Sequence, residues 1–232
     1  MSADDLKRAA AEAALAYVEN DMCVGLGTGS TAAHFIELLG AKARNGLYVT
    51  GVATSDETHN KAASLGIDVI VPDEATRIAV AVDGADEVDP ALNVIKGGGA
   101  ALLREKIVAD AAEKFIVIAH RSKLVPQLGA FPLPVEIEPA HWSLTVSAVR
   151  DCLARLGYDG AVNLRGTAGQ PATLTDGGHY VLDCTLSRIS DAATLDTALR
   201  IIPGVIETGL FIGMTDIAIV AGEDGVETIT RS

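Results

Sequence analysis

Hydroxyl groups and glycines gather in residues 25–31, between an apolar run of strand length and a predicted helix. Glycines let a backbone approach a ligand, and the first turn of a helix offers N–H groups and partial positive charge to an anion. Thr28, Ser30 and Thr31 add hydroxyl donors on either side of Gly29. The segment predicts an anion site; the alternative is a plain glycine turn in which Ser30 only caps the helix.

A dinucleotide site is a second interpretation of this segment, and the spacing disfavours it. The glycines follow the pattern GxGxG, whereas the dinucleotide fingerprint is GxGxxG with an acidic residue closing the second strand. Here the nearest acidic residue, Asp56, comes after Thr54 and Ser55. By itself, the segment indicates an anion and nothing more specific.

Carboxylates gather in residues 83–87, directly after the apolar run 78–82. Ligands of open α/β sheets bind beyond the carboxyl ends of the strands, which is where these side chains are expected. Asp83 and Asp86 are therefore candidate ligand-binding residues. A Mg²⁺ or Ca²⁺ site and a solvated acidic turn are alternatives, although the segment has neither EF-hand spacing nor a histidine partner.

Three consecutive glycines, Gly97, Gly98 and Gly99, follow Lys96 and open a predicted helix. Such a run is costly in backbone entropy, so it is typical of a turn that admits a ligand or another backbone.

Glu105 lies about a turn and a half into that helix, where its neighbours on the helix surface are all apolar. A carboxylate alone in an apolar stripe can serve as a general base or acid. The alternative is that Leu103 and Ile107 form the buried stripe and leave Glu105 partly exposed. The apolar neighbours are Ala101, Leu102, Val108, Ala109 and Ala112.

A basic segment, residues 120–123, follows the apolar run 115–119. Arg121 and Lys123 could bind a phosphate at the same edge of the sheet. An ordinary polar loop is the alternative.

The elements that position these segments alternate between strand and helix patterns. A capping box of Ser2 and Asp5 begins a helix that runs to about residue 18. The alternation predicts a mostly parallel sheet with helices on both faces. Further helices are expected over 31–39, 57–65 and 100–112, and strands over 22–26, 48–54, 67–71, 78–82, 115–119 and 216–221.

The pattern changes near residues 131–134, and the order after it is β-α-β-(hairpin)-α-β, close to the ferredoxin-like pattern. We therefore predict an α/β protein with two domains: a mostly parallel sheet domain, residues 1–130 and 207–232, and an inserted ferredoxin-like α+β domain, residues 131–206. In the second half, strands are expected over 135–138, 160–164, 171–175, 179–186 and 205–211, and helices over 144–156 and 192–201.

Composition limits the partners. The chain of 232 residues has 18 basic and 31 acidic side chains, a formal net charge of −13. Proteins that bind nucleic acid usually show the opposite balance, so a nucleic-acid partner is not expected. Neither a signal peptide nor an apolar run of membrane-spanning length is visible, which predicts a cytoplasmic protein with no membrane partner. The three cysteines lack metal-site spacing and are expected to be buried thiols.

Taken in order, these segments resemble type A ribose-5-phosphate isomerase over nearly the whole chain. Any one glycine loop is weak evidence, whereas four such segments in this order and spacing are specific. The matching residues are 25–33, 82–87, 95–106, Ser122 and Lys123, 131–136, 202–205 and 209–211.

The resemblance implies interconversion of ribose 5-phosphate and ribulose 5-phosphate. It also implies a Rossmann-like catalytic domain that carries the site, a smaller α+β domain that contributes to oligomer contacts, and a homodimer or homotetramer. It implies that Glu105 is the proton acceptor and that Asp83, Asp86 and Lys96 line the sugar end. His120 departs from the pattern, since relatives often carry Asp there. The substrate-binding residues that the resemblance implies are Thr28, Gly29, Ser30, Thr31, Asp83, Gly84, Ala85, Asp86, Lys96, Gly97, Gly98, Gly99, Lys123 and Lys7, although an exposed helix Lys is the alternative for Lys7.

The residue types favour proton transfer through an enediolate over a metal-assisted hydride shift, because no set of metal ligands is visible. Glu105 would be the carbon base, and Lys96 with the glycine N–H groups would stabilise the oxyanion. Asp83 would move hydroxyl protons and help to open the furanose ring, and Asp86 would orient sugar hydroxyls or Lys96. No cofactor and no metal are expected. Rival interpretations are an aminosugar-phosphate deaminase, a CoA transferase, a sugar-phosphate-sensing regulator domain and a nucleotide-binding oxidoreductase.

Overall fold

The computed structural model describes residues 1–166 and 171–231. The chain divides into two compact units, and each is described by itself. Unit 1 comprises Met1–Ala85, Arg104–Leu124 and Gly213–Ser232, and unit 2 comprises Asp86–Leu103 and Val125–Ile212.

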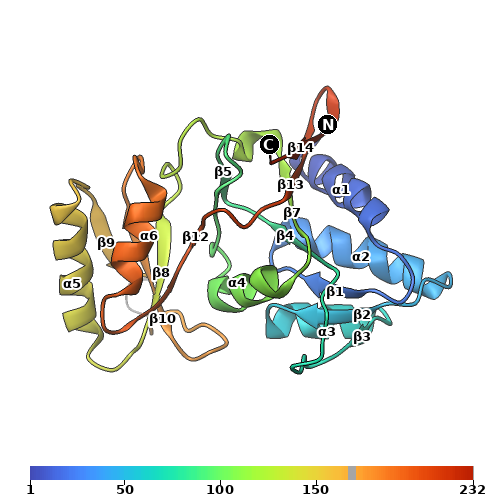
Figure 1. The fold of residues 1–232 in the computed structure, drawn as a ribbon, viewed down its shortest axis with the longest axis horizontal. Helices are drawn as coiled ribbons and strands as arrows, with labels where there is room; N and C mark the ends of the chain where they lie inside the picture. Colours follow the sequence, from blue (N-terminus) through green and yellow to red (C-terminus); the bar gives the residue numbers. More distant parts are fainter. Residues whose placement is uncertain (167–170, 232) are drawn as a thin grey trace. The chain divides into compact units, whose positions relative to one another are not determined.

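Unit 1 is built on a seven-stranded sheet of order β14-β13-β7-β4-β1-β2-β3 (Figure 1). All neighbouring strands pair in parallel except β13 and β14, which form an antiparallel hairpin. The C-terminal part of the chain thus returns to the first sheet, as predicted. The strands are β1 (Cys23–Leu26), β2 (Thr50–Ala53), β3 (Asp68–Val69), β4 (Val80–Gly84), β7 (Phe115–His120), β13 (Ile217–Gly222) and β14 (Gly225–Thr230).

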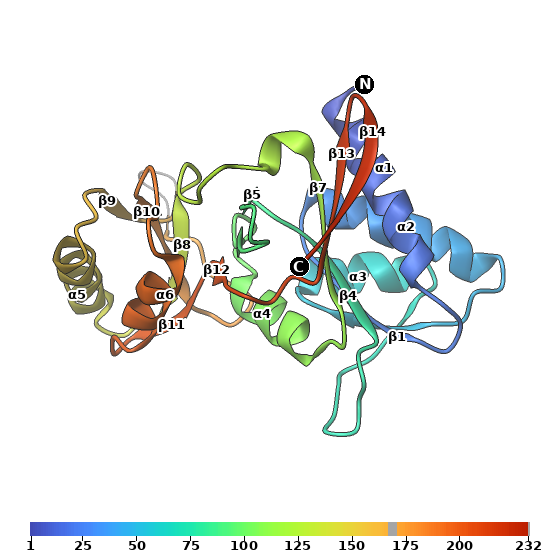
Figure 2. The ribbon, with the colours of Figure 1, turned by 45° about the horizontal axis from the view of Figure 1, so that its top comes forward.

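Helices α1 (Ala3–Ala14) and α2 (Ser30–Arg44) pack on one face of this sheet, with α3 (Asp56–Ser64) beside β2 and β3. The core on this face contains side chains from α1, α2 and alternate strand positions such as Val24 and Leu26. Figure 2 shows the β13–β14 hairpin alongside α1. A 3₁₀ turn, Leu15–Tyr17, follows α1.

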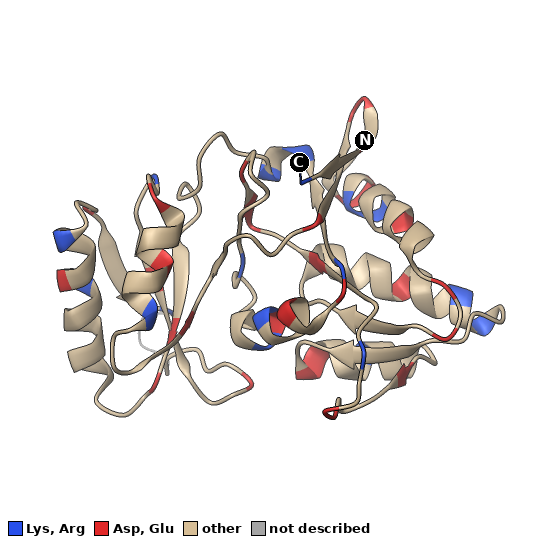
Figure 3. Ribbon diagram, viewed as in Figure 1, with Lys and Arg blue, Asp and Glu red and all other residues tan. Residues whose placement is uncertain are grey.

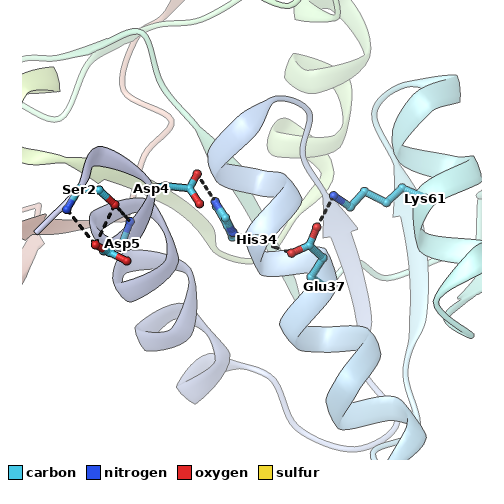
Figure 4. Close-up of polar contacts among 6 residues, drawn as sticks. All are labelled: Ser2, Asp4, Asp5, His34, Glu37 and Lys61. Carbon is cyan, nitrogen blue, oxygen red and sulfur yellow. Dashed lines mark hydrogen bonds and ion pairs between the residues drawn. The ribbon is translucent and has the colours of Figure 1, made fainter.

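Polar contacts at the start of α1 fix its position against α2 (Figure 4). Ser2 and Asp5 form the predicted capping box, in which the Asp5 amide donates to Ser2 Oγ at 3.1 Å. Asp4 Oδ1 lies 3.0 Å from Nε2 of His34 in α2. Glu37, one turn further along α2, accepts from Lys61 Nζ of α3 at 2.7 Å, which holds the pKa of Glu37 below its usual value.

Helix α4 (Leu102–Ala111) lies on the opposite face of the sheet. Val108 reaches the strands there, because a Cβ placed on Gly25 would lie 2.6 Å from Val108 Cγ1 and 2.7 Å from Ala81 Cβ. Since α4 ends shortly before β7 begins at Phe115, it must run back antiparallel to the strands. Its first turn therefore points toward the carboxyl ends of β1, β4 and β7.

Unit 2 contains a four-stranded antiparallel sheet of order β11-β8-β10-β9. This strand order with two helices on one face is the predicted ferredoxin-like pattern. Leu133, Val135 and Ile137 of β8 face the helical core, so Pro134 and Glu136 face away from it. The elements are β8 (Leu133–Ile137), α5 (Trp142–Arg155), β9 (Ala161–Leu164), β10 (Tyr180–Thr185), α6 (Ala192–Arg200) and β11 (Val205–Thr208).

Some predicted elements were wrong in extent. The strand predicted over 205–211 is two strands in different sheets, because β12 (Leu210–Phe211) pairs with β6 (Val94–Ile95), which also pairs with β5 (Glu87–Val88). The strand predicted over 171–175 contributes one isolated bridge, Leu174 to Tyr180. A short 3₁₀ turn, Arg121–Lys123, follows β7.

Two observations concern the predicted absence of membrane and nucleic-acid partners: the length of the apolar helices and the distribution of charge. Within the described part of the chain, no helix is long and apolar enough to cross a membrane. Acidic and basic residues are interspersed along α1 and α4 (Figure 3).

Candidate functional site

Asp83 lies at the carboxyl end of β4, on the sheet face that α4 covers. The prediction placed Asp83 just after the strand, whereas β4 extends through Gly84. Asp83 Oδ1 accepts hydrogen bonds from the amides of Thr28 at 3.1 Å and Gly84 at 2.7 Å. A Cβ on Gly27 would lie 2.2 Å from Asp83 Cγ, so only glycine leaves room for this carboxylate. The β1 loop and Asp83 thus form one packed arrangement, and Asp83 is 3 % exposed.

The first turn of α2 is open to an anion. The N-cap is Gly29, at φ 104°, so the alternative that placed Ser30 there as a side-chain cap is wrong. Among the described residues, no side chain caps this helix. The first amides of a helix have no intrahelical partner, and here they begin at the exposed Ser30. A Cβ on Gly29 would have no atom within 4 Å, so the space beside this N-cap residue is open.

The Thr28 hydroxyl belongs to a hydroxyl network beneath the loop. Its Oγ1 lies 2.7 Å from Thr54 Oγ1, 2.9 Å from Ser55 Oγ and 3.2 Å from Thr58 Oγ1. Thr58 in turn donates to the Gly27 carbonyl at 2.9 Å. The Thr28 side chain therefore braces the loop, and its backbone amide holds Asp83. Sequence reasoning noted Thr54 and Ser55 only as the end of a strand and missed this role.

Glu105 lies in the buried stripe of α4 and is 4 % exposed. Ile107 is 58 % exposed, so the alternative in which Leu103 and Ile107 form the buried stripe is wrong. Glu105 precedes Val108 by one turn, about 4.5 Å along the helix, and Asp83 follows Ala81 by two strand residues, about 6.6 Å. Since Val108 packs near Ala81 and α4 runs antiparallel to β4, Glu105 and Asp83 lie over the same strand end of unit 1.

His120, at the end of β7, is affected by burial and by two lysines of unit 1. Burial lowers the pKa of His120, and the positive charges of Lys123 and Lys7 lower it further. Lys7 is half-buried on α1, which packs against β7. Ser122 Oγ lies 2.8 Å from His120 Nδ1. Because β7, β4 and β1 are neighbours, these side chains share a sheet edge with the predicted anion loop.

The other predicted residues lie in unit 2. Asp86 Oδ2 accepts a hydrogen bond from the Gly98 amide at 2.8 Å. Lys96 is buried, its Nζ lies 5.6 Å from the centre of the Phe211 ring, and its amide donates to the Gly209 carbonyl at 2.9 Å. Ala100, which ends the glycine run, has φ 60°, a left-handed conformation that costs a non-glycine residue about 1–3 kcal/mol.

Each carboxylate of the acidic segment 83–87 is bound by backbone amides. Asp83 and Asp86 each accept backbone amides, and Glu87 accepts those of Gly129 and Phe131 at 2.6 and 2.5 Å. Across residues 1–166 and 171–231, no three His, Cys, Asp or Glu side chains are grouped so that they could hold a metal ion. Cys152 and Cys184 are buried free thiols, as expected, and Cys23 is half-buried.

Comparisons with known proteins agree on one family. Residues 50–225 match the family model described as ribose 5-phosphate isomerase A (phosphoriboisomerase A). The chain is 51% identical over 231 residues to ribose-5-phosphate isomerase A of Rhodopseudomonas palustris strain BisB18, covering 100% of both chains. It resembles a solved D-ribose-5-phosphate isomerase in complex with phospho-erythronic acid, with TM-score 0.92, 40% identity and 100% of both chains covered. Ribose 5-phosphate isomerase A from Methanocaldococcus jannaschii gives TM-score 0.90 and 38% identity, over 99% of this chain and 100% of that one.

Proposed function

We propose how this chain, which belongs to the ribose 5-phosphate isomerase A family and interconverts D-ribose 5-phosphate and D-ribulose 5-phosphate, carries out that reaction. Glu105 takes the proton from C2 of the open-chain aldose. The C2–H electron pair then forms a C1–C2 double bond, and O1 becomes an oxyanion. Glu105 returns the proton to C1, while the hydroxyl proton of O2 passes to O1. The observation that carries this proposal is the burial of Glu105 and Asp83 over the same strand end.

Asp83 suits the second acid/base role because its orientation is fixed. Two backbone amides bind Oδ1 and hold the carboxylate in one orientation, and we propose that it moves hydroxyl protons and helps to open the furanose ring.

Lys96 and the N–H groups of the glycine run other than that of Gly98, which binds Asp86, are proposed to stabilise the oxyanion, with Asp86 orienting sugar hydroxyls or Lys96. Fixed donors aimed at developing charge are often the largest single contribution to catalysis. Phospho-erythronic acid carries a carboxylate near the position of the enediolate oxygens. We therefore propose it as a probe of these donors in this chain.

The phosphate is proposed to bind at the open first turn of α2, with Thr31 and the nearby Lys7 and Lys123. Helix N-termini bind phosphate through free amides and the helix dipole, and ammonium groups add charge. His120 has a lowered pKa and is therefore expected to be neutral at pH 7, so that the two lysines supply the positive charge there.

We further propose that the enzyme works without a cofactor or metal, as a cytoplasmic homodimer or homotetramer. The Rossmann-like catalytic domain of residues 1–130 and 207–232 and the inserted domain of residues 131–206 remain our proposal for its domains.

The purified protein should convert ribose 5-phosphate to ribulose 5-phosphate in EDTA with no nucleotide added. Initial rates should be the same with and without added Mg²⁺ or NAD, because the proposed acid and base are side chains of the chain itself. An enzyme that lost activity in EDTA and recovered with one divalent metal would contradict the proton-transfer mechanism.

Lys123→Ala should raise KM for ribose 5-phosphate far more than it changes turnover of unphosphorylated ribose. The expected loss of binding free energy for ribose 5-phosphate is about 1.5–3 kcal/mol, the range for a hydrogen bond to a charged group. Lys42→Ala, an exposed lysine in the last turn of α2, is the matched control and should leave KM unchanged. An unchanged KM in Lys123→Ala would remove this lysine from the phosphate site.

A further inference from the structure

Arg165 lies directly after β9, and its guanidinium contacts the glycine run. Its Nη1 donates to the carbonyl oxygens of Gly97 at 2.8 Å and Gly98 at 3.2 Å. Its Nε and Nη2 donate to the two carboxylate oxygens of Asp183 at 3.0 and 2.5 Å. The planar fork is therefore held on one side by a bidentate carboxylate and on the other by two consecutive carbonyls.

The sheet of unit 2 fixes both members of this pair. The Arg165 amide donates to the Val181 carbonyl of β10 at 2.7 Å. Asp183 lies in the same strand, between two residues, Leu182 and Cys184, that face the helical core, so its side chain faces away from the helices. The Arg165 and Asp183 side chains are 16% and 29% exposed, so solvent screens them only in part.

Holding these carbonyls also sets the direction of two amides. In a trans peptide the N–H points opposite to the C=O of the same plane. The Gly97 carbonyl shares its plane with the Gly98 amide, which donates to Asp86 Oδ2. The Gly98 carbonyl shares its plane with the amide of Gly99, an exposed residue, so that amide is directed away from Arg165.

The glycine run is restrained by one turn hydrogen bond, from the Ala100 amide to the Gly97 carbonyl at 3.0 Å, and from outside by Arg165. Glycine populates both signs of φ, and Gly97 is at φ 100°. If either peptide plane, Gly97–Gly98 or Gly98–Gly99, rotated by half a turn, a carbonyl oxygen would take the place of the N–H group. That oxygen would repel an oxyanion. Arg165 opposes that rotation, and its charge polarises both planes so that their N–H groups become stronger donors.

We propose that Arg165, held by Asp183, is a positioning residue for the isomerisation. It directs one amide to hold Asp86 and the next to stabilise the developing oxyanion. The inference rests on the proposed role of the glycine run. Because Asp183 neutralises the guanidinium, Arg165 acts by orientation and local polarisation rather than by net charge.

Two substitutions at this position test the proposal. Arg165→Met removes the guanidinium and should lower kcat at least ~10-fold with little change in KM. This loss of kcat should be smaller than the ~10²–10³-fold loss that follows outright deletion of an oxyanion donor. Affinity for phospho-erythronic acid should fall by a similar factor. Arg165→Lys keeps the charge but cannot donate to the carboxylate and the carbonyls at once as the guanidinium does. Its kcat should therefore lie between those of the wild type and Arg165→Met.

Arg150→Met is the matched control in the same unit. Arg150 Nη2 donates to the carbonyl of Val162 in β9 at 2.8 Å, so this variant also loses an arginine–carbonyl bond. It should lower Tm to a similar extent as Arg165→Met and leave kcat unchanged. Equal losses of kcat in the two variants, or a folded Arg165→Met with wild-type kcat, would overturn the proposal.

A readout without turnover separates this inference from the proposed function. In ¹⁵N-labelled protein, the amide resonances of Gly98 and Gly99 should shift in Arg165→Lys and stay in place in Arg150→Met. Unshifted resonances in Arg165→Lys would overturn the positioning role. A wild-type protein that failed to isomerise ribose 5-phosphate would instead refute the proposed function, whatever these resonances did.

Discussion

Glu105→Gln is expected to lower kcat by at least ~10²–10⁴-fold, the usual range for losing a general base. The amide keeps the volume of the side chain and its capacity for hydrogen bonds but cannot accept the proton from carbon. Since Glu105 is 4 % exposed and glutamine has the same shape, the amide should fit without repacking. Affinity for phospho-erythronic acid should therefore change little.

Solvent exchange identifies the step that is lost. Wild-type enzyme should exchange the C2 proton of ribose 5-phosphate with D₂O, and Glu105→Gln should lose this exchange in step with turnover. Asp83→Asn should also be slow, but some exchange at carbon should remain because its role is with hydroxyl protons. Glu113→Gln makes the same change at an exposed position just after α4 and should behave as wild type. Near wild-type turnover and exchange in Glu105→Gln would move the search for the base to Asp83 or Asp86.

The location of Glu105 could be predicted because the signal is local. Helical periodicity placed five apolar neighbours around it, and four of them are buried in the structure. Lys106, which lies outside that set of apolar neighbours, is also buried, at 8 % exposed. A helix that is covered around most of its circumference does not follow a two-sided pattern.

The contacts that orient the predicted residues could not be predicted, because they join segments far apart in the chain. Arg165 is separated in sequence from Gly97 by 68 positions and from Gly98 by 67, and Thr28 is separated from Thr54 by 26 positions. Nothing local distinguishes Arg165 from a solvated arginine next to a strand. A signal for the Thr28 network was visible in hindsight, since Thr54, Ser55 and Thr58 follow the neighbouring strand at the same sheet edge.

Short and exposed strands were missed for a physical reason. β5 and β6 were missed, and β12 was joined to β11 in one predicted strand, because each of these three strands has two residues, too few to show a period of two. β14 is exposed along most of its length, so it lacks the alternation of apolar and polar residues that indicates a half-buried strand. The long parallel strands and the β-α-β-β-α-β order carried enough pattern for the fold class.

Gly27→Ala is expected to lower kcat/KM about 100-fold and to destabilise the protein by about 1–3 kcal/mol, the usual range for overpacking. The new Cβ would lie 2.2 Å from Asp83 Cγ and Oδ1 and 2.6 Å from its Cα, so rotation of the Asp83 side chain alone cannot relieve the clash. The strand end must shift, and a displacement of about 1 Å at a catalytic group can cost about 10²-fold in rate.

Gly84→Ala is the matched control for stability, because its Cβ would lie 3.8 Å from Thr31 Cβ, an ordinary contact. Its Tm should equal or slightly exceed that of the wild type, since alanine restricts the unfolded chain. In the double variant Gly27→Ala with Asp83→Gly, the collision with Cγ and Oδ1 disappears. Part of the lost stability should return while turnover stays low, because the carboxylate is gone. If Gly27→Ala instead kept wild-type Tm and kcat/KM, Asp83 would not depend on the space over Gly27, and its fixed orientation could not be part of the mechanism.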